Sequence, residues 1–530
     1  MIYRNSSDRV HIPPISIAEH VLSRATKYKS KNALIDAFTG ETITYGKLDE
    51  LTARGASGLV RAGIAPGDVV ALAGPNSPMY AVAVHSILRA GAAVTPLNPA
   101  MTSGEMAKQI ADSGARALIS SQDAARKLED APLPSPLLHR FTLEPADESE
   151  AECSTKPFNS LLDSSPGPLP SIDPNDVAVL PYSSGTTGTA KGVVLTHRNI
   201  VANLEQLRAG WRISEDDVVC AALPFFHIYG FTIILNSALL AGATIVTLPR
   251  FELRAYLSAV QDFGVTRGHL APPVVLALAN SPDVDEFDLT SMRTAVSGAA
   301  PLDRDTAARA EIRTGIIIRQ GYGMTEASPG THLVYDGEFD ATPSGSVGRL
   351  LPDTEARIVD PGTNEDVPPG ERGELLVRGP QVMREYLNNP AATTATITDG
   401  WLHTGDIAQV VDGNFYIVDR LKELIKYKGY QVAPAELEAL LLTHPQVHDA
   451  AVVGLPDVEA GEIPQAFVVA DTILDVAELM AWIARQVAPY KRIRDIQLVD
   501  KIPRSAAGKI LRRVLKVDLR SEETTPVQEK

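Results

Sequence analysis

The residues best suited to chemistry lie in one short segment, where hydroxyl side chains and glycines surround a single lysine. Residues 182–192 read Tyr-Ser-Ser-Gly-Thr-Thr-Gly-Thr-Ala-Lys-Gly and follow the apolar run 177–180. Glycines let the backbone turn its N–H groups inward, hydroxyls add short donors, and a lysine supplies positive charge. The segment therefore predicts a phosphate-binding loop. Its candidate contacts are Ser183, Ser184, Gly185, Thr186, Thr187 and Lys191.

Two other interpretations fit this loop less well. A Walker A loop requires Gly-Lys followed by Ser or Thr, whereas here Ala190 precedes the lysine and Gly192 follows it. A solvated linker is the second alternative. Linkers seldom hold one lysine between glycines and continue directly into an apolar stretch such as 193–195. We therefore favour a phosphate-binding loop.

Two further segments carry groups that suit a nucleotide. Residues 320–326, Gln-Gly-Tyr-Gly-Met-Thr-Glu, combine a flat aromatic ring, a hydroxyl and a carboxylate between glycines. These groups suit base stacking and cation binding, while a dinucleotide fingerprint would need glycine in place of Glu326. Residues 400–406 end in Asp406, and a carboxylate at such a turn either binds a ribose diol or simply caps the turn.

Single functional groups stand out at two other places. Residues 224–230 gather aromatic side chains around His227, which favours a pocket wall, although a lone histidine is more often a core residue. Lys509 lies in a turn of small residues, 503–510, that suits the delivery of one amine to a distant target. This turn belongs to a basic segment, 485–520, most of whose charges we expect on a solvated surface.

Composition limits the class of protein. The chain has 530 residues, of which 44% are hydrophobic, and this length suggests roughly three domains. A net charge of −16 argues against a general nucleic-acid binder. The two cysteines, Cys153 and Cys220, fit neither a disulfide framework nor a zinc site and suggest a reducing cytoplasm. Polar residues interrupt the apolar stretch 231–248, which predicts helix 232–240 and strand 244–248 rather than a membrane span.

The first half of the chain alternates strand and helix patterns. A strand at 69–73, a helix at 79–90 and a strand at 93–97 give the βαβ rhythm that builds parallel sheets with helices on both faces. The polar, proline-rich stretch 144–174 predicts a surface connection before the phosphate loop. The fold class is therefore α/β.

The second half has a different character. Short strands and turn signals dominate residues 345–420, which predicts a small β-rich subdomain. Beyond it, apolar strands at 450–454 and 466–469 indicate a separate compact region. We therefore expect a large N-terminal domain, 1–420, that includes the β-rich subdomain, and a small α+β C-terminal domain, 421–530.

In this order and spacing, the segments resemble the adenylate-forming superfamily of acyl-CoA synthetases, luciferases and peptide-synthetase adenylation domains. They are most similar to the 4-coumarate:CoA ligases, and the resemblance extends over nearly the whole chain. One departure is Ala190, which stands where the family usually has proline before the loop lysine. The segments that carry the resemblance are 182–192, 224–229, 297–302, 321–326, 400–406, 418–429, 431–436 and 508–509.

The resemblance implies a ligase that uses ATP, Mg²⁺ and CoA. ATP would activate a carboxylic acid as an acyl-adenylate with loss of pyrophosphate, and the CoA thiol would then displace AMP. Lys509 would bridge the carboxylate and the α-phosphate, which Thr325 also contacts, and Glu326 would bind Mg²⁺. Asp406 and Arg420 would hold the ribose. Besides the phosphate loop, the other nucleotide contacts implied are Gly298, Ala299, Ala300, Gln320, Gly321, Tyr322, Lys422 and Gln431.

The resemblance also implies that the small C-terminal domain is mobile. It would turn about a hinge near Leu421 and Lys422, withdraw Lys509 after adenylation and present a second face to CoA. Lys426 would act on that face, with His227 as a gate to the thiol tunnel. The residues implied for CoA binding are Lys428, Gly429 and Tyr430.

The pocket residues indicate the class of acid. Amino-acid-activating domains usually offer an aspartate near the pocket entrance, and residues 225–229 contain none. The glycines of the implied pocket leave a flat slot that suits an arylpropenoate such as 4-coumarate or cinnamate, and medium-chain fatty acids also fit. The positions that match the aryl pocket of coumarate ligases are Tyr229, Gly298, Gly321, Gly323, Pro329 and Gly330.

Two other functions are compatible with the sequence. An adenylating enzyme that passes its acyl group to a carrier protein or another non-CoA nucleophile would carry the same lysine segments. A non-catalytic nucleotide-binding protein with this fold is the second, and the intact Lys191, Glu326 and Lys509 argue against it. The expected partners are a small carboxylic acid, ATP and CoA, and the sequence leaves both a monomer and a dimer open.

Overall fold

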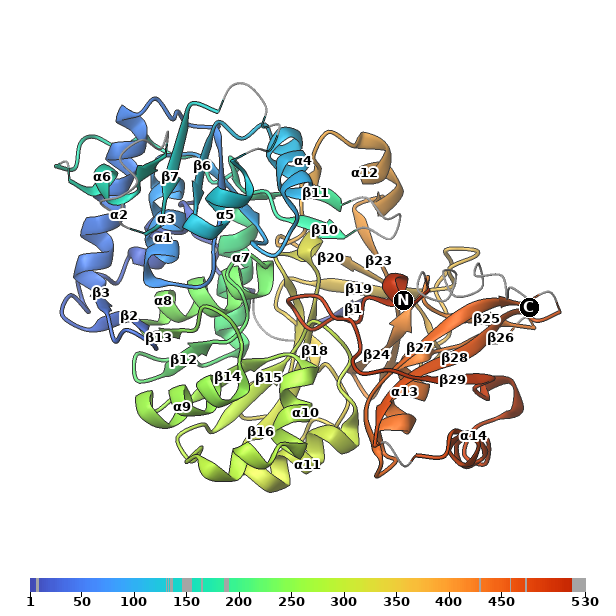
Figure 1. Cartoon of the computed structure of the whole chain (residues 1–530). Helices are drawn as coiled ribbons and strands as arrows, with labels where there is room; N and C mark the ends of the chain where they lie inside the picture. The colour runs from blue at the N-terminus through green and yellow to red at the C-terminus, as the bar shows by residue number, and fades with distance from the viewer. Residues whose placement is uncertain are drawn as a thin grey trace, which may run out of the picture.

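The computed structural model describes residues 1–5, 9–129, 131, 133, 137–144, 155–163, 165–184, 190–428, 430–457, 459–471 and 474–516. Within these ranges the chain forms four sheets, two of nine strands, one of six and one of five (Figure 1). The fold is the expected α/β architecture, and its C-terminal sheet, orange to red in Figure 1, lies to one side of the large N-terminal part. No helix in these ranges combines the length and the apolar composition needed to cross a membrane.

The first nine-stranded sheet contains the predicted βαβ unit. Strands β4 (Val69–Ala73) and β5 (Ala93–Leu97) have the predicted bounds, and helix α3 (Pro78–Arg89) joins them as parallel neighbours. The other strands are β6 (Ala117–Ser120), β7 (His139–Thr142), β8 (Lys156–Pro157), β9 (Val177–Val179), β10 (Tyr182–Ser184), β11 (Ala190–Thr196) and β21 (Glu385–Tyr386). Their order is β10-β11-β9-β5-β4-β6-β7-β8, with β21 paired to β11. The helices of this region are α2 (Tyr45–Arg61), α4 (Ser103–Ser113), α5 (Gln122–Lys127) and α6 (Asn159–Leu162).

The second nine-stranded sheet has a parallel centre. Its strands are β2 (Asn32–Asp36), β3 (Thr42–Thr44), β12 (Val218–Ala221), β13 (Thr244–Thr247), β14 (Arg267–Leu270), β15 (Thr294–Ser297), β16 (Ile317–Gly323), β17 (Gly330–Leu333) and β18 (Arg349–Leu350). Strands β2, β13, β12, β14, β15 and β16 run parallel, so their carboxyl ends meet at one edge, where ligands bind in open α/β sheets. Helices α9 (Leu253–Phe263), α10 (Pro272–Asn280) and α11 (Arg304–Thr314) accompany these strands.

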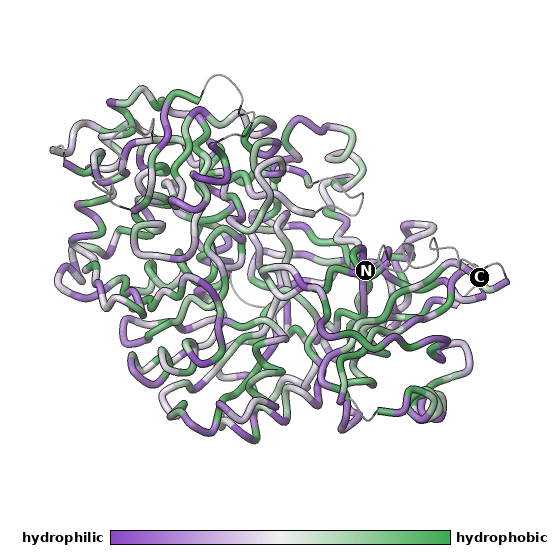
Figure 2. Tube along the Cα trace, in the orientation of Figure 1, coloured by the Kyte–Doolittle hydropathy of each residue, from purple (hydrophilic) through white to green (hydrophobic). Residues whose placement is uncertain are grey.

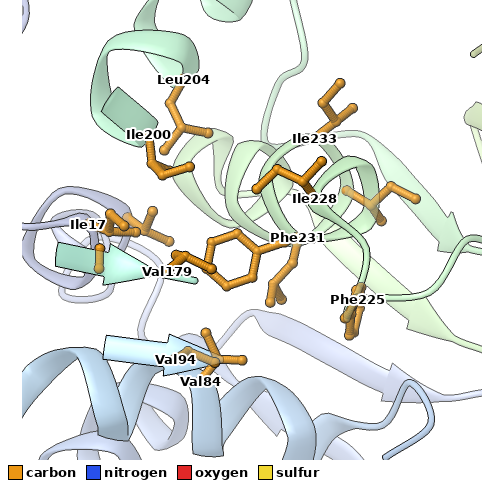
Figure 3. Close-up of a cluster of buried hydrophobic side chains, with 14 of the residues drawn as sticks. Ile17, Val84, Val94, Val179, Ile200, Leu204, Phe225, Ile228, Phe231 and Ile233 are labelled. Atoms are coloured by element: carbon orange, nitrogen blue, oxygen red, sulfur yellow. The ribbon is translucent and has the colours of Figure 1, made fainter. Parts of the chain in front are cut away.

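The two large sheets share one apolar core. Helices α1 (Ile17–Leu22), α7 (His197–Gly210) and α8 (Ser237–Ala241) contribute to it. Figure 3 shows the ring of Phe231 directed at Val179, with Val94 of the first sheet and Ile200 of α7 nearby. In Figure 2, hydrophobic segments gather inside this lobe and hydrophilic stretches follow its outer rim. Because the core joins both sheets, the site edge of the second sheet is held rigidly.

The segment after His227 is a π-helix, η1 (Tyr229–Asn236), followed by α8, where the sequence predicted one ordinary helix over 232–240. The amide of Asn236 donates to Phe231 O at 2.7 Å, and the hydroxyl of Ser237 donates to Thr232 O at 3.2 Å. These side chains bond carbonyls five residues earlier, in competition with the normal helical ladder. Strand β13 follows a left-handed Gly242, close to its predicted place.

The six-stranded sheet is antiparallel and comes mainly from the region predicted to be β-rich. It contains β1 (Tyr3–Arg4), β19 (Glu355–Val359), β20 (Gly373–Arg378), β22 (Ile397–Thr398), β23 (Trp401–Val411) and β24 (Asn414–Arg420). Helix α12 (Pro390–Thr396) precedes β22. Strand β1, near the N-terminus, joins the six-stranded sheet by pairing with β19. Strands β18 and β21 come from the same part of the chain as the other strands of this sheet but pair with strands of the two large sheets.

The C-terminal sheet has its own core. Its strands are β25 (Ile425–Tyr427), β26 (Tyr430–Val432), β27 (Val447–Asp457), β28 (Gly461–Ala470) and β29 (Asp495–Leu498), and its helices are α13 (Pro434–Leu442) and α14 (Val476–Ala484). Residues of these strands and helices form an apolar cluster separate from the main one. Strands β27 and β28 contain the two predicted strands, extended at both ends into a long hairpin.

A buried carboxylate fixes the edge of the second sheet opposite the strand ends. Asp217, only 2% exposed, precedes β12 and accepts hydrogen bonds from Thr266 Oγ1 and Arg293 Nη2, both at 2.7 Å. Its second oxygen lies 3.3 Å from Nε of Arg267, at the start of β14. Burial alone would raise the pKa of Asp217, but the Ser214 N–H, the Thr266 hydroxyl and the arginines hold it below its usual 3.8. These bonds align the starts of β12, β14 and β15.

We expect Asp217→Asn to destabilise the protein by about 3 kcal/mol at pH 7, because buried donors and an arginine lose their charged partner. A carboxyl whose pKa is lowered by folding stabilises above its unfolded pKa and loses that effect as the pH falls through the folded value. The gap in unfolding free energy between wild type and variant should therefore shrink below about pH 4. Urea unfolding at several pH values measures it.

The exposed neighbour offers a matched control. Asp216→Asn removes the same charge one residue away and should change stability by no more than about 0.5 kcal/mol. An Asp217→Asn deficit that stays constant from pH 7 to pH 3.5 would contradict the assignment of stability to the ionised carboxylate.

Candidate active site

A cleft of about 640 Å³ lies between the second sheet, the six-stranded sheet and the C-terminal region. Segments that are far apart in the sequence meet in its walls: the turn after β15, the end of β16, the paired strands β23 and β24, and the lysine turn. The predicted site residues in its lining are Ala299, Ala300, Gln320, Gly321, Tyr322, Gly323, Asp406, Arg420 and Lys509.

Asp406 is held between an arginine and a phenol. Residues 406 and 420 are direct partners in the β23–β24 pair, and Arg420 Nε lies 3.3 Å from Asp406 Oδ1. The hydroxyl of Tyr322, from the other sheet, donates to Asp406 Oδ2 at 2.5 Å. Burial raises the pKa of Asp406, while Arg420, Tyr322 and Lys509 oppose that rise. The carboxylate is thus a fixed, desolvated acceptor at the cleft wall.

The Lys509 turn reaches the large domain through a glycine. Gly508 has φ of +84°, and a Cβ there would lie 2.9 Å from the Cβ of Ala271 and 3.2 Å from Cδ of Pro273. Ser505 closes the turn, because its hydroxyl accepts from Lys509 N at 3.2 Å and its N–H donates to Lys509 O at 2.7 Å. Burial, reinforced by Arg420, lowers the pKa of Lys509, and Glu423 and Asp406 oppose this effect.

A buried ion cluster supports this lysine, and the sequence did not identify it. Arg512 Nη1 lies 2.5 Å from Glu423 Oε2, and its Nη2 lies 2.6 Å from Glu438 Oε1 on α13. The other oxygen of Glu423 is 4.0 Å from Lys509 Nζ. The sequence placed most charges of 485–520 on a solvated face, yet Arg512 is largely buried. Its spacing of three residues from Lys509 was the available signal.

Glu326 and the ends of the phosphate loop form a second group. Oε1 of Glu326 accepts from Ser183 Oγ and from Tyr386 Oη, each at 2.8 Å. Lys191 is the β11 partner of Ser183, and its Nζ lies 4.6 Å from the ring centre of Tyr386. Thr325 begins the short 3₁₀-helix Thr325–Ala327 that carries Glu326. Gly185, Thr186, Thr187 and the side chain of Ser184 lie outside the described residues.

Arg420 of the cleft interacts electrostatically with Glu326 of this second group. Burial opposes the charged form of Arg420, but Asp406, Glu423, Tyr322 and Glu326 together raise its pKa. Arg420 is therefore a permanent cation between the two acidic positions. In the described part of the chain, no three His, Cys, Asp or Glu side chains gather as a metal cluster.

The implied acyl pocket is shaped by close backbone contacts. The hydroxyl of Tyr229 donates to Val296 O at 3.1 Å, and a Cβ at Gly298 would lie 2.9 Å from the Tyr229 ring. A Cβ at Gly323 would lie 2.1 Å from Pro329 O, so only glycine fits there. At Gly321 the nearest atoms are 3.5 Å from such a Cβ, which leaves ordinary space. Two of the glycines are thus demanded by the protein itself, beyond any need for a flat slot.

The far wall of this pocket is tied to helix α7. Asn203 donates through Nδ2 to Gly330 O at 2.9 Å and accepts at Oδ1 from Gly330 N at 3.0 Å. Pro329 and Gly330 are both buried. Beside Tyr229, burial lowers the pKa of His227 to about 4, and its Nδ1 accepts from Tyr229 N at 3.3 Å. His227 is therefore neutral near pH 7.

The described residues implied for the second face, which include the CoA contacts Lys428 and Tyr430, do not line this cleft. Lys426 and Gln431 are partners in the β25–β26 hairpin, and Tyr430 stacks on Tyr490 with ring centres 4.5 Å apart. None of these three lines the cleft that holds Lys509. Lys428 is exposed in the turn of the hairpin, Lys422 is exposed just after β24, and Gly429 lies outside the described residues. The two predicted lysine faces are thus separated in this arrangement.

Comparison with known proteins identifies a family. Residues 21–387 match the model of AMP-binding enzymes, and residues 436–509 match the AMP-binding enzyme C-terminal domain. 4-Coumarate–CoA ligase 2 of Petroselinum crispum is 42% identical, over 98% of this chain and 97% of that protein. 4-Coumarate–CoA ligase 5 of Oryza sativa subsp. japonica is also 42% identical, over 96% of this chain and 97% of that one.

Solved structures agree with these relatives. ATP-bound MatB from Rhodopseudomonas palustris is 30% identical with a TM-score of 0.84, over 96% of this chain and all of that one. The anthranilate CoA ligase AuaEII, in complex with anthranoyl-AMP, is 25% identical with a TM-score of 0.86, over 96% of this chain and 98% of that one. The chain therefore belongs to the AMP-binding enzyme family and is an acid–thiol ligase of its acyl-CoA synthetase type, similar to the 4-coumarate–CoA ligases.

Proposed function

We propose that the protein activates an arylpropenoic acid such as 4-coumarate or cinnamate with ATP and transfers the acyl group to CoA. The observation that carries this proposal is the meeting of Lys509 with Asp406, Arg420 and Tyr322 in one cleft. In this cleft the amine of Lys509 meets a hydrogen-bond acceptor, a permanent cation and an aromatic ring, which come from the other three residues. The 42% identity to 4-coumarate–CoA ligases over nearly the whole chain supports the aryl substrate.

ATP binds, in this proposal, with its ribose on the Asp406–Arg420 pair. The desolvated carboxylate accepts from ribose hydroxyls, and Tyr322 presents a ring face to the adenine. Ala299, Ala300 and the side chain of Gln320, which line the cleft, border the base, and Gly298 precedes them in the chain. Gln320 already accepts from Leu302 N at 3.0 Å, which fixes its amide. Lys422 and Gln431 contact the nucleotide when the C-terminal part turns.

The polyphosphate lies toward Ser183 and Lys191, where the loop supplies donors and charge. Mg²⁺ prefers one or two carboxylates together with phosphate oxygens and water. Glu326 fits this role because Ser183 and Tyr386 both donate to its Oε1, and neither of these two bonds uses Oε2. When bound, the ion neutralises charge on the phosphates. Thr325, next to Glu326, contacts the α-phosphate.

Adenylation joins two anions, and Lys509 lowers that barrier. A carboxylate oxygen of the acid forms a bond to the α-phosphorus while the bond to pyrophosphate breaks. An ammonium held between both groups stabilises the charge that accumulates on the phosphorus centre, and the partly closed cleft strengthens this interaction. Glu423 and Arg512 hold the turn that delivers the amine.

Thioester formation requires a second arrangement. We assign residues 1–420 and 421–530 to two domains that turn about a hinge at Leu421 and Lys422, which brings the β25–β26 hairpin to the site. The thiol sulfur of CoA then forms a bond to the acyl carbon, and AMP leaves. Lys426 acts on this face, with Lys428, Gly429 and Tyr430 toward CoA and neutral His227 as the gate to the thiol.

The acid lies between Tyr229 and the glycine-lined wall at 321–323. Gly298 brings the edge of the slot against the Tyr229 ring, and Pro329 and Gly330 close its end. A planar, conjugated acid fills such a slot with little loss of conformational freedom.

Two cysteines in 530 residues, without a pairing motif, support a reducing cytoplasm as the compartment.

We expect Lys509→Ala to slow adenylation by roughly 100- to 1,000-fold, because the developing charge loses its ammonium. Thioester formation from supplied acyl-adenylate should persist, since the amine is withdrawn in that step. Single-turnover assays of each half-reaction make this comparison.

The exposed Lys501 offers a control in the same basic segment. Lys501→Ala should leave both half-reactions within about twofold of wild type, as surface substitutions usually do. Equal loss of both steps in Lys509→Ala would refute the two-arrangement assignment.

We expect ATP-dependent pyrophosphate release with cinnamates to exceed that with benzoates and medium-chain fatty acids. The organic product, followed by mass, should be the acyl-CoA whenever CoA is present. Pyrophosphate release without an acyl-CoA product would instead support transfer to a carrier protein or another nucleophile. A preference for fatty acids would refute the aryl assignment while leaving the ligase chemistry intact.

A further inference from the structure

Asp419 bonds across the point where the chain leaves the six-stranded sheet. It lies on β24, next to Arg420, and is only 5% exposed. Its Oδ2 accepts from Ala435 N at 2.9 Å, and its Oδ1 accepts from Arg420 N at 2.7 Å. Ala435 belongs to α13, which packs on the C-terminal sheet, so the carboxylate connects two separate sheets.

Helix α13 has no side-chain cap of its own within the described residues. Its N-cap position is Ala433, whose side chain has no acceptor, and Pro434 at the first position has no N–H. Ala435 is the second helical residue, whose N–H a cap usually satisfies. By contrast, α14 is capped locally by Asp475, which accepts from Ala477 N and Glu478 N. Asp419 therefore supplies from the other sheet what the sequence of α13 lacks.

Asp419 is largely buried, although it and Ala435 also border the cleft. Ile407 beside Asp406, Leu424 and Ala433 form a small buried apolar cluster that spans both sheets. The charged groups that face Asp419 are Arg512 and Glu438. Burial raises the pKa of Asp419 to about 6, with Arg512 opposing the rise and Glu438 adding to it.

A continuous set of bonds leads from this cap to the catalytic amine. Glu438 on α13 binds Arg512, Arg512 binds Glu423, and Glu423 faces Lys509. All four side chains follow Asp419 in the sequence and belong to the C-terminal part. A displacement of α13 therefore displaces the Lys509 turn with it.

We propose that Asp419 is a positioning residue that caps α13 from across the hinge, holds Lys509 in the adenylate-forming arrangement, and must release Ala435 before the thioester step. This proposal rests on the two-step function above. In this proposal Asp419 contacts neither the substrate nor the nucleotide. Its role is to set the balance between the adenylate-forming and the thioester-forming arrangements.

The charge of Asp419 makes the cap releasable. The carboxylate is desolvated in the capping arrangement and returns to water when the C-terminal part turns away. A carboxyl whose pKa is higher in one arrangement favours that arrangement when protonated, so capping strengthens as the pH falls through about 6 and weakens as it rises. The rise from 3.8 to about 6 corresponds to at most a roughly 100-fold change in this preference.

Two substitutions separate the hydrogen bond from the charge. Asp419→Asn removes the desolvated charge and keeps one acceptor oxygen, which can serve Ala435 N while the bond from Arg420 N is lost. We therefore expect adenylation within about twofold of wild type and a roughly three- to tenfold slower acyl transfer from supplied adenylate to CoA. Asp419→Ala leaves Ala435 N without its acceptor, so adenylation should fall about three- to tenfold while acyl transfer is maintained. Half-reaction rates measured on the full chain give the ratio of the two steps.

The pH dependence of this ratio supplies a further readout. From pH 5.5 to pH 8, the ratio of adenylation to transfer should fall more steeply in wild type than in Asp419→Asn. Asp406 and Lys509 are present in both proteins, so their own titration is common to the two profiles, and the difference reports the charge of Asp419 together with its effect on the neighbouring Glu438. Identical profiles would overturn the role of the Asp419 charge.

Asp475→Ala is the matched control, because it removes a local cap within the same C-terminal part. It should lower thermal stability and leave the ratio of the two steps within about twofold. If Asp419→Ala and Asp475→Ala behave alike, Asp419 is merely structural and the proposal is refuted.

Amide hydrogen exchange without any substrate tests the cap independently of activity. Peptides covering the start of α13 should exchange at least threefold faster in Asp419→Ala than in wild type, and α14 should be unchanged. Unchanged exchange at α13 refutes the cap even if the ligase assignment holds. Faster exchange in a protein that forms no acyl-CoA would instead place the failure in the proposed function.

Discussion

The bond between Asp406 and its two partners determines the shape of the cleft. Asp406 and Arg420 come from neighbouring strands of the six-stranded sheet, and Tyr322 comes from the second large sheet. One desolvated carboxylate thereby joins the two sheets at the cleft wall, in addition to the backbone bonds between Val347, Gly348 and Phe415. Removing a partner from a buried charge is expensive, so the sheets are held at a fixed separation. The proposed nucleotide site depends on that separation.

The two sides of the cleft are held together by separate sets of contacts. The strand ends of the second sheet are aligned from behind by Asp217 and from within by the core around Phe231. The lysine turn is supported by its own cluster of Arg512, Glu423 and Glu438. Each side has its own internal network, and Asp419 and Gly508 are two of the points where the sides meet. The proposed two-step reaction requires such a division, because each step makes different demands on the same site.

The sequence predicted the parts of this arrangement that depend on local patterns. Strands 69–73 and 93–97 lie between clear turn signals, and Lys509 lies in the small-residue turn where the sequence placed it. Asp406 was expected at a turn but lies within strand β23, where it pairs with Arg420 of β24. The π-helix at 229–236 escaped prediction because it depends on side chains that bond backbone carbonyls. Arg512 resembled an ordinary surface cation, and only the folded chain brings Glu438 to it.

The same limit applies to the cap on α13. Asp419 and Ala435 are separated by sixteen positions and a hairpin, and no local pattern relates them. Their partnership arises from the angle between two sheets. Features that depend on tertiary contacts of this kind are also the ones that distinguish two arrangements of one chain.

The backbone at Gly508 packs against an apolar surface of the N-terminal part. The lysine turn lies against Ala271 and Pro273, and a proline ring offers no N–H to a neighbour. This contact between Gly508 and the side chains of Ala271 and Pro273 is apolar and has no preferred direction. Separating the two surfaces leaves no hydrogen-bond donor of these side chains unpaired, and bringing them together again requires no exact alignment. If the C-terminal part turns as proposed, this apolar contact can open and close without breaking a hydrogen bond between Gly508 and these two residues.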